Sequence, residues 1–302
     1  MKKNIFIPLC CLLWMFCFNN SYAVLKIVST TEDLAAIAKA IGADQVQVVS
    51  LTPGTRDPHF AEAKPSMIHK VFSANLLLLI GADLESAWLP AVLRSSRNAK
   101  VQPGKPGYLD LSQSVKILAR SHTHIDRSMG DVHAAGNPHY WLNPDNGLLI
   151  AKAIKNRLSQ LDANHTDFYH ENFSRFANQL TEKKQQWQQA LMFLHNKPVI
   201  AYHNSLLYLA DFFQFTIEKE LEPKPGISPG ASHLASLVQL IHKKNIQWLI
   251  MEPYYEQRSA DFLKRKTNIK LVIIPQSVGA RPEITNYFQL FDAIVNSFQA
   301  VQ

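Results

Sequence analysis

The stretch TDFYHENFSRFANQLTEKKQQWQQALMFLH, residues 166–195, decides the fold. No proline or glycine interrupts it, and its apolar residues recur at steps of three, four and seven, at Phe173, Phe176, Leu180, Trp187, Leu191 and Leu194. This spacing predicts one amphipathic helix. At about 1.5 Å per residue, roughly 30 residues would span about 45 Å, which is too long for a packing helix inside one small domain. The stretch therefore predicts a rigid strut that joins two lobes.

Both flanks of this helix alternate short apolar strands with helices. Upstream, we expect a helix over Asp83–Leu93 and strands over Leu25–Ser29, Val46–Leu51 and Leu76–Ile80. Downstream, we expect strands over Val199–Tyr202, Phe215–Ile217, Trp248–Met251 and Leu271–Ile274. Such alternation predicts an α/β fold with a parallel sheet in each lobe. The expected domains are an N-terminal lobe over 24–165, a linking helix over 166–196 and a C-terminal lobe over 197–302.

The first 23 residues have the layout of a secretory signal peptide. Lys2 and Lys3 precede an apolar run over 5–18, and Ser21-Tyr22-Ala23 offers a cleavage site. The apolar run is shorter than the roughly 20 residues of a membrane-spanning helix. Bulky residues precede Cys17 where a lipid-attachment site needs small ones, which argues against a lipoprotein signal. We expect export and cleavage after Ala23.

Charge and cysteine usage narrow the function classes. The net charge of +7 is spread along the chain without a basic run, whereas nucleic-acid binding proteins gather such charge into a stripe. We therefore expect no nucleic-acid partner. All three cysteines, Cys10, Cys11 and Cys17, lie in the expected signal peptide. The mature chain can form no disulfide, and any metal site in it must use histidine and carboxylate ligands.

Three histidines stand out by their positions. His59 lies in a loop after a strand, His139 lies between Pro138 and an aromatic pair, and His203 ends a strand. In open α/β sheets, ligands bind at the carboxyl ends of the strands. Histidines so placed in two lobes can converge on the cleft between them and offer nitrogen ligands to a metal such as zinc. The spacing alone does not establish that they converge.

The residues around these histidines resemble the signatures of one family. Asp57-Pro58-His59, followed by Glu62 and Lys64-Pro65-Ser66, is similar to the "DPH…E…PS" signature of metal receptors of bacterial ABC transporters. This is the zinc/manganese solute-binding family, also called cluster A-I or cluster 9. Further matches follow in order over the mature chain: Asn137–Pro144 resembles "NPHxWLDP", Tyr202-His203-Asn204 with Tyr208 resembles "HDAFGYF", Ile227–Gly230 resembles "ISPG" and Met251-Glu252-Pro253 resembles "EPQ".

The resemblance implies a fold, a site and a function. The fold is two α/β lobes joined by one long helix, with the metal held in the cleft between them. His59, His139 and His203 match the family's histidine ligands, and histidine at the third position favours zinc over manganese. The implied function is high-affinity capture of Zn²⁺ in the periplasm and its delivery to an integral-membrane permease driven by a cytoplasmic ATPase. Zinc would be the cargo of a monomeric receptor with no catalytic residue.

The sequence departs from the family pattern at one position. The family's fourth ligand is usually an aspartate, and here Gln276 takes its place. A neutral amide is a poorer zinc ligand. Gln276 either approaches the metal or hydrogen-bonds a ligand histidine, and the fourth ligand is left open between water, Glu62, Asp57 and a loop histidine.

A segment with His122, His124 and His133 lacks core periodicity. It is similar to the histidine-rich loops of zinc receptors, and it either collects metal or is a solvated loop. We expect the primary site to be independent of the segment over 121–136.

Three alternatives stay open at this point. One is a receptor of the same family for Mn²⁺ or Fe²⁺. Another is a secreted hydrolase that uses three histidines and a water on zinc, although no zinc-protease motif is present. The last is an adhesin-like surface protein on the same fold.

Overall fold

The computed structural model describes residues 24–120 and 133–302. The expected signal peptide with its cleavage position, and the loop residues His122 and His124, lie outside the described residues. Within those two ranges, no helix combines the length and hydrophobicity that crossing a membrane requires.

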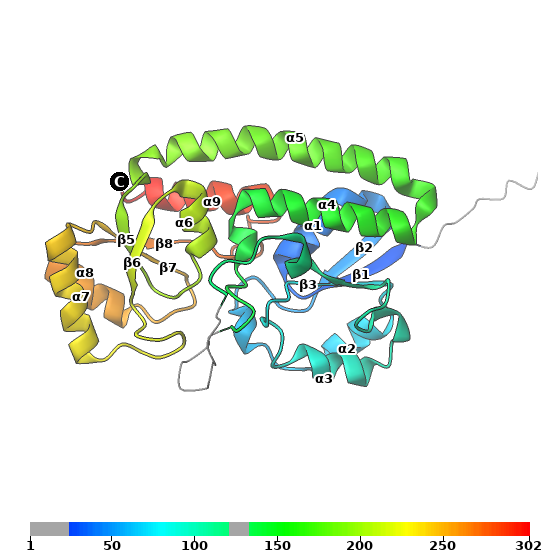
Figure 1. Ribbon diagram of the computed structural model, residues 1–302, viewed down its shortest axis with the longest axis horizontal. Helices are drawn as coiled ribbons and strands as arrows, with labels where there is room; N and C mark the ends of the chain where they lie inside the picture. Colours follow the sequence, from blue (N-terminus) through cyan, green and yellow to red (C-terminus); the bar gives the residue numbers. More distant parts are fainter. Residues whose placement is uncertain (1–23, 121–132) are drawn as a thin grey trace, which may run out of the picture.

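The first lobe is built on a four-stranded parallel sheet. The strand order is β2 (Val46–Ser50), β1 (Leu25–Ser29), β3 (Leu76–Leu79) and β4 (Tyr108–Asp110). Alternate residues of β3 enter different cores: Leu76 and Leu78 join one cluster, whereas Leu77 and Leu79 join another. Both faces are thus buried, as the period of two along a strand requires. In Figure 1, helices α1 (Glu32–Gly42) and α4 (Pro144–Leu161) cover one face, and α2 (Pro65–Phe72) and α3 (Leu89–Ser96) cover the other.

The second lobe repeats this arrangement. Its parallel sheet has the order β6 (Thr216–Glu220), β5 (Pro198–Ala201), β7 (Trp248–Met251) and β8 (Lys270–Ile273). The helices of this lobe are α6 (Leu207–Phe213), α7 (Ala231–Lys244), α8 (Arg258–Thr267) and α9 (Tyr287–Gln299). The expected α/β class with parallel sheets is confirmed.

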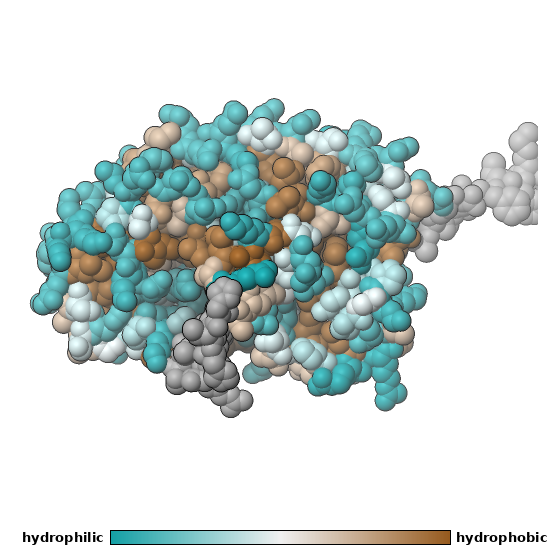
Figure 2. Space-filling model, viewed as in Figure 1, coloured by the Kyte–Doolittle hydropathy of each residue, from teal (hydrophilic) through white to brown (hydrophobic). Residues whose placement is uncertain are grey.

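The long helix α5 (Thr166–Ala190) runs along both lobes, as Figure 1 shows. Its Asn172 amide donates to the carbonyl of Ile41 at the end of α1 at 2.9 Å, and Lys183 and Trp187 both bond Asp292 of α9. The helix is thereby anchored to both lobes, which confirms the predicted strut. Below α5, Figure 2 shows a hydrophobic band in a surface that is otherwise mostly hydrophilic.

Two helix boundaries differ from the expectation. Helix α5 ends at Ala190 rather than near His195, because the chain tightens into a 3-10 turn and then reverses at Asn196, whose φ is +59°. The helix expected from Asp83 begins at Leu89. Gly81, Ala82 and Asp83 all have positive φ, which right-handed helices exclude, so the chain turns before α3 starts.

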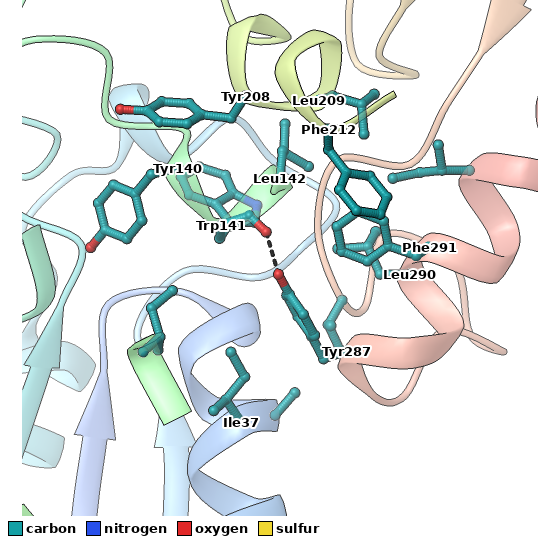
Figure 3. Close-up of a cluster of buried hydrophobic side chains, with 14 of the residues drawn as sticks. Ile37, Tyr140, Trp141, Leu142, Tyr208, Leu209, Phe212, Tyr287, Leu290 and Phe291 are labelled. Carbon is teal, nitrogen blue, oxygen red and sulfur yellow. Dashed lines mark hydrogen bonds between the residues drawn. The ribbon is translucent and has the colours of Figure 1, made fainter. Parts of the chain in front are cut away.

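The lobes share one hydrophobic core at the segment Tyr140–Leu142. Figure 3 shows this segment between Ile37 of α1 and residues of α6 and α9. The Tyr287 hydroxyl donates to the Trp141 carbonyl at 2.6 Å, and the Trp141 indole donates to the Gln276 carbonyl at 2.9 Å. The Tyr140 hydroxyl donates to the Ile80 carbonyl at the end of β3. One segment thus bonds to both lobes. The domain boundaries at 165 and 197 stay a prediction.

A second contact between the lobes leaves no room for a side chain at Gly54. A Cβ atom there would lie 1.9 Å from the Val278 carbonyl oxygen. Beside it, Asp33 of α1 accepts hydrogen bonds from the Ser277 hydroxyl and the Val278 amide. The loop after β2, which contains Gly54, and the loop after β8 therefore meet backbone to backbone.

We expect Gly54→Ala to lower the free energy of unfolding by about 1–3 kcal/mol, because the backbone opposite cannot move aside and the loops must separate. Thermal and urea denaturation measure the loss. Gly230→Ala is the matched control, since nothing lies within 4 Å of its Cβ position and only the N-cap preference of glycine is lost, at below about 1 kcal/mol. Equal losses in the two variants would contradict the close contact.

Candidate metal centre

The three predicted histidines come from three loops at the carboxyl edges of the two sheets. His59 lies in the 3-10 turn Pro58–Phe60 that follows β2, and His203 lies two residues after β5. His139 directly precedes the buried turn Tyr140–Leu142. Because that turn is fixed in the core shared by both lobes, His139 is fixed with it.

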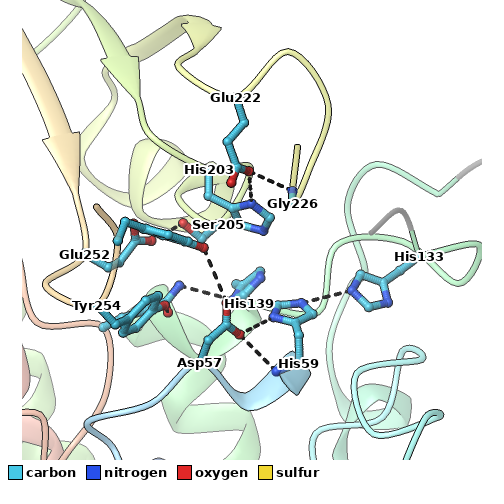
Figure 4. A network of polar contacts seen from close by, with 12 residues as sticks. Asp57, His59, His133, His139, His203, Ser205, Glu222, Gly226, Glu252 and Tyr254 are labelled. Carbon is cyan, nitrogen blue, oxygen red and sulfur yellow. Dashed lines mark hydrogen bonds and ion pairs between the residues drawn. The ribbon is translucent and has the colours of Figure 1, made fainter. Parts of the chain in front are cut away.

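The structure brings these side chains together. The ring nitrogens nearest the centre of the cluster, one each from His59, His139 and His203, all lie within 4.8 Å of one another. Among the described residues, these three histidines form a group that could hold a metal ion. The ring centroids are 5.0 Å apart for His59 and His139, and 5.8 Å apart for His59 and His203. All three residues are buried. Figure 4 shows that the rings approach one another from different elements.

Two of the rings are oriented by carboxylates. Asp57 accepts from Nδ1 of His59 at 2.6 Å, and Glu222 accepts from Nδ1 of His203 at 2.7 Å. Both Nδ1 atoms are therefore donors, which leaves the Nε2 lone pairs for a metal. Burial opposes the charge of Asp57, yet its bonds to His59 outweigh burial and lower the pKa of Asp57. Burial also acts to lower the pKa of His203, but the bond to Glu222 and nearby carboxylates raise that pKa above its usual value.

His139 has a different environment. Burial, followed by the neighbouring histidines, lowers its pKa well below the usual value, so the ring is neutral. A neutral imidazole is the form that binds a metal. Its Nδ1 lies 3.3 Å from the Gln276 amide nitrogen. Asn137 accepts from the His139 amide and donates to the carbonyl of Asn204, so it ties the His139 loop to the His203 loop.

Gln276 thus contacts a histidine of the cluster. It is buried, and its side-chain oxygen accepts from the Tyr254 hydroxyl. Glu62 is exposed and is not part of the histidine group. Of the expected fourth-ligand candidates, Asp57 is already bonded to His59.

His133 lies at the cluster, although its segment is expected to be independent of the primary site. Its Nε2 is 3.0 Å from Nε2 of His59. A cavity of about 50 Å³ is lined by His133, His139 and His203 together with Pro225. His133 therefore belongs to the surroundings of the same site, and the independence of the primary site from the segment over 121–136 stays a prediction.

Sequence reasoning did not identify Glu222 and assigned no chemistry to Glu252. Glu222 follows β6 by two residues and Glu252 directly follows β7, so the rule that points to His203 would also have pointed to them. Glu252 is fully buried, accepts from the Ser205 hydroxyl and has one oxygen without a partner among the described residues.

Comparison with known proteins identifies the family. The family described as ZnuA, "Zinc-uptake complex component A periplasmic", matches residues 27–301. The chain belongs to this family. Members of the ZnuA family are solute-binding proteins and not enzymes, so the alternative of a zinc hydrolase is excluded. The chain is the metal-binding, substrate-binding component of an ABC transporter.

The curated relatives of this chain are named either for manganese or for a metal that the name does not specify. The chain is 25% identical over 260 residues to the metal ABC transporter substrate-binding lipoprotein FimA of Streptococcus parasanguinis, covering 82% of this chain and 78% of that one. It is 24% identical over 266 residues to the manganese ABC transporter substrate-binding lipoprotein PsaA of Streptococcus pneumoniae, covering 84% and 80%. A crystal structure of ZnuA superposes with a TM-score of 0.76 at 22% identity, covering 92% of this chain and 99% of that one, which shows the same fold.

The buried carboxyl of Glu252 makes a pH-dependent contribution to stability. Burial raises its pKa to about 7 from a usual 4.5. The folded state therefore binds a proton that the unfolded state releases. The contribution is fully present below about pH 4.5 and is lost as the pH rises through about 7.

We expect the stability advantage of the wild type over Glu252→Gln to shrink by up to about 3 kcal/mol between pH 4.5 and pH 8, since the amide cannot titrate. Urea denaturation of the metal-free protein across this range measures the difference. Glu256→Gln, which makes the same replacement at an exposed neighbour, serves as the control for the loss of one carboxyl group. A pH-independent difference for Glu252→Gln would refute the raised pKa.

Proposed function

We propose that this chain captures Zn²⁺ in the periplasm and delivers it to a membrane permease coupled to a cytoplasmic ATPase. The observation that carries the proposal is the convergence of imidazoles from His59, His139 and His203, with no carboxylate in the group. Nitrogen ligands suit zinc, whereas manganese prefers oxygen ligands. Export with cleavage after Ala23 belongs to the same proposal.

The charge of the dication needs compensation, because Gln276 brings none. Asp57 and Glu222 each supply one negative charge. Each carboxylate is hydrogen-bonded to Nδ1 of a ligand imidazole, so that only the imidazole ring separates it from the metal. Carboxylates in this position increase the basicity of the ligand nitrogen. The bonds from His59 and His203 to the metal are thus strengthened by two carboxylates that do not themselves coordinate it. These carboxylates compensate for the charge of the missing aspartate without adding an oxygen ligand.

His133 is the fourth ligand in this proposal. Zinc–nitrogen bonds of about 2.0–2.1 Å place the nitrogens of a tetrahedral site about 3.3 Å apart. The 3.0 Å separation between Nε2 of His133 and Nε2 of His59 is close to such an edge. The other ligand nitrogens lie within 4.8 Å of one another, so their separations would shorten by at most about 1.5 Å when the metal enters.

A manganese receptor is the competing function. The name of the relative PsaA favours it. Against it, the carboxylates of Asp57 and Glu222 already accept hydrogen bonds from imidazoles of the group. A competition of Zn²⁺ and Mn²⁺ for the purified mature chain decides between the two, and preferential binding of Mn²⁺ would overturn the zinc proposal.

We expect His59→Ala, His139→Ala and His203→Ala each to weaken zinc binding more than about 100-fold, beyond the ~10–100-fold effect of residues that only orient a ligand. Competition against a chelator of known affinity measures the change. His69→Ala and His242→Ala remove exposed histidines and should leave the affinity unchanged. Zinc should also raise the thermal stability of the wild type by mass action and fail to do so in the three site variants.

The variant His133→Ala tests whether the fourth ligand of the metal is His133 or a water molecule. A lost ligand should weaken zinc binding by at least about tenfold, and the tetrahedral cobalt spectrum of the Co²⁺-loaded protein should change. His133→Gln keeps a side chain of similar reach as a control for packing and should also lose affinity. Wild-type affinity and an unchanged cobalt spectrum in both variants would assign the fourth position to water.

A further inference from the structure

The side chain of Gln276 is held between the histidine cluster and Tyr254. Its oxygen accepts a hydrogen bond from the Tyr254 hydroxyl, and its amide nitrogen lies 3.3 Å from Nδ1 of His139. Its backbone carbonyl accepts from the Trp141 indole at 2.9 Å, and the residue is only 3% exposed. The backbone of Gln276 is thus fixed at the core that the lobes share, and only its side chain can rearrange.

Tyr254 determines which end of this amide faces the cluster. The Tyr254 hydroxyl keeps its proton, because burial and the carboxylates of Glu252 and Asp57 raise its pKa well above the usual value. That proton is donated to the amide oxygen. The NH₂ group of Gln276 is therefore the end that points toward His139, beside Tyr254 in Figure 4.

This contact leaves His139 without a lone pair for a metal. His139 is neutral, and a neutral imidazole has a proton on one ring nitrogen and a lone pair on the other. An NH₂ group can only donate, so Nδ1 supplies the lone pair and Nε2 carries the proton. A metal at Nδ1 must displace the amide, whereas a metal at Nε2 must move the proton to Nδ1, which then needs an acceptor. In both cases the amide of Gln276 has to turn before His139 can coordinate.

The other two histidines of the group are free of this conflict. Nδ1 of His59 donates to Asp57. Nδ1 of His203 donates to Glu222. Their Nε2 lone pairs are thus available before a metal arrives. Among the three, it is His139 whose hydrogen bond in the metal-free protein competes with the metal.

Both residues of the competing contact depart from the family signatures. Gln276 stands where the family usually has an aspartate, and Tyr254 stands where the word "EPQ" has a glutamine. An aspartate has no NH₂ group and, when ionised, cannot donate to an imidazole. The competition at His139 is therefore a property of this chain's own pair of residues.

We propose that Tyr254 and Gln276 form a latch that sets the metal affinity: Tyr254 holds the amide oxygen, the amide nitrogen occupies His139, and metal binding has to break this arrangement. This inference rests on the proposed function, since it takes His139 as a metal ligand. The free energy needed to turn the amide is subtracted from that of metal binding, so the latch weakens the affinity. Both are positioning residues that act through His139.

Tyr254→Phe tests the latch because it removes the hydroxyl and keeps the ring, which packs against Tyr255 with centroids 4.7 Å apart. Zinc binding should become about three- to tenfold tighter, since one hydrogen bond that opposes it is lost. Competition against a chelator of known affinity measures the change. Tyr169→Phe, which removes a buried tyrosine's hydroxyl bonded to Asp162, is the matched control and should leave the affinity unchanged. Unchanged or weaker binding by Tyr254→Phe would overturn the latch.

A double-mutant cycle shows whether the hydroxyl acts through the amide. Gln276→Met keeps a side chain of similar length and removes both ends of the amide. In this background Tyr254→Phe should change the zinc affinity by less than about twofold, because the two residues no longer interact. An equal gain with and without the amide would show that the hydroxyl acts by another route, and would overturn the latch.

The position of the proton on His139 gives a test that needs no stability assumption. Proton–nitrogen NMR spectra of the metal-free wild type, labelled with ¹⁵N-histidine, should show the proton on Nε2 of His139 and on Nδ1 of His59. The signal that His139→Gln removes identifies His139. A proton on Nδ1 of His139 would mean that the amide presents its oxygen, and would overturn the latch. Preferential binding of Mn²⁺ by the wild type would instead overturn the proposed function, because this spectrum is recorded without any metal.

Discussion

The structure depends on the burial of Tyr140–Leu142 in a hydrophobic core that both lobes share. Trp141 and its neighbours are almost fully buried, and their polar atoms bond to the ends of strands and helices from each lobe. A burial of this size contributes several kcal/mol, and it fixes His139 at the segment's start. The interface between the two lobes is therefore their shared hydrophobic core, and α5 runs across this interface. Large opening of the lobes would expose this core, so metal exchange must use small movements of loops.

The site is held together by hydrogen bonds between specific pairs of buried polar groups. Nδ1 of His59 and Nδ1 of His203 donate to carboxylates, and Asn137 connects two of the loops that carry ligands. Buried imidazoles and carboxylates would be costly if they were left unpaired. The same bonds turn the Nε2 atoms toward the centre. The same hydrogen bonds thus stabilise the metal-free site and orient the ligand nitrogens for metal binding.

Several features were predictable because they follow from local patterns. The unbroken apolar spacing over 166–195 predicted α5, and the family signatures around His59, His139 and His203 predicted the members of the cluster. Helix α3 and the end of α5 were misplaced because positive φ values at Ala82 and Asn196 leave no signal in apolar spacing. His133 was assigned to an auxiliary loop because nothing in its neighbours shows that the chain returns to His59.

The sequence by itself determined the α/β class, the helical strut, the family and the confinement of all three cysteines to the first 17 residues. These follow from periodicity and composition, which act over neighbouring residues. Only the tertiary structure decided that Glu222 orients His203, that Gln276 contacts His139 and that His133 reaches His59. Each of these contacts joins residues from separate loops, 19, 137 and 74 positions apart. Their distances are set by how the two sheets pack around a common core, and no local pattern in the chain encodes that packing.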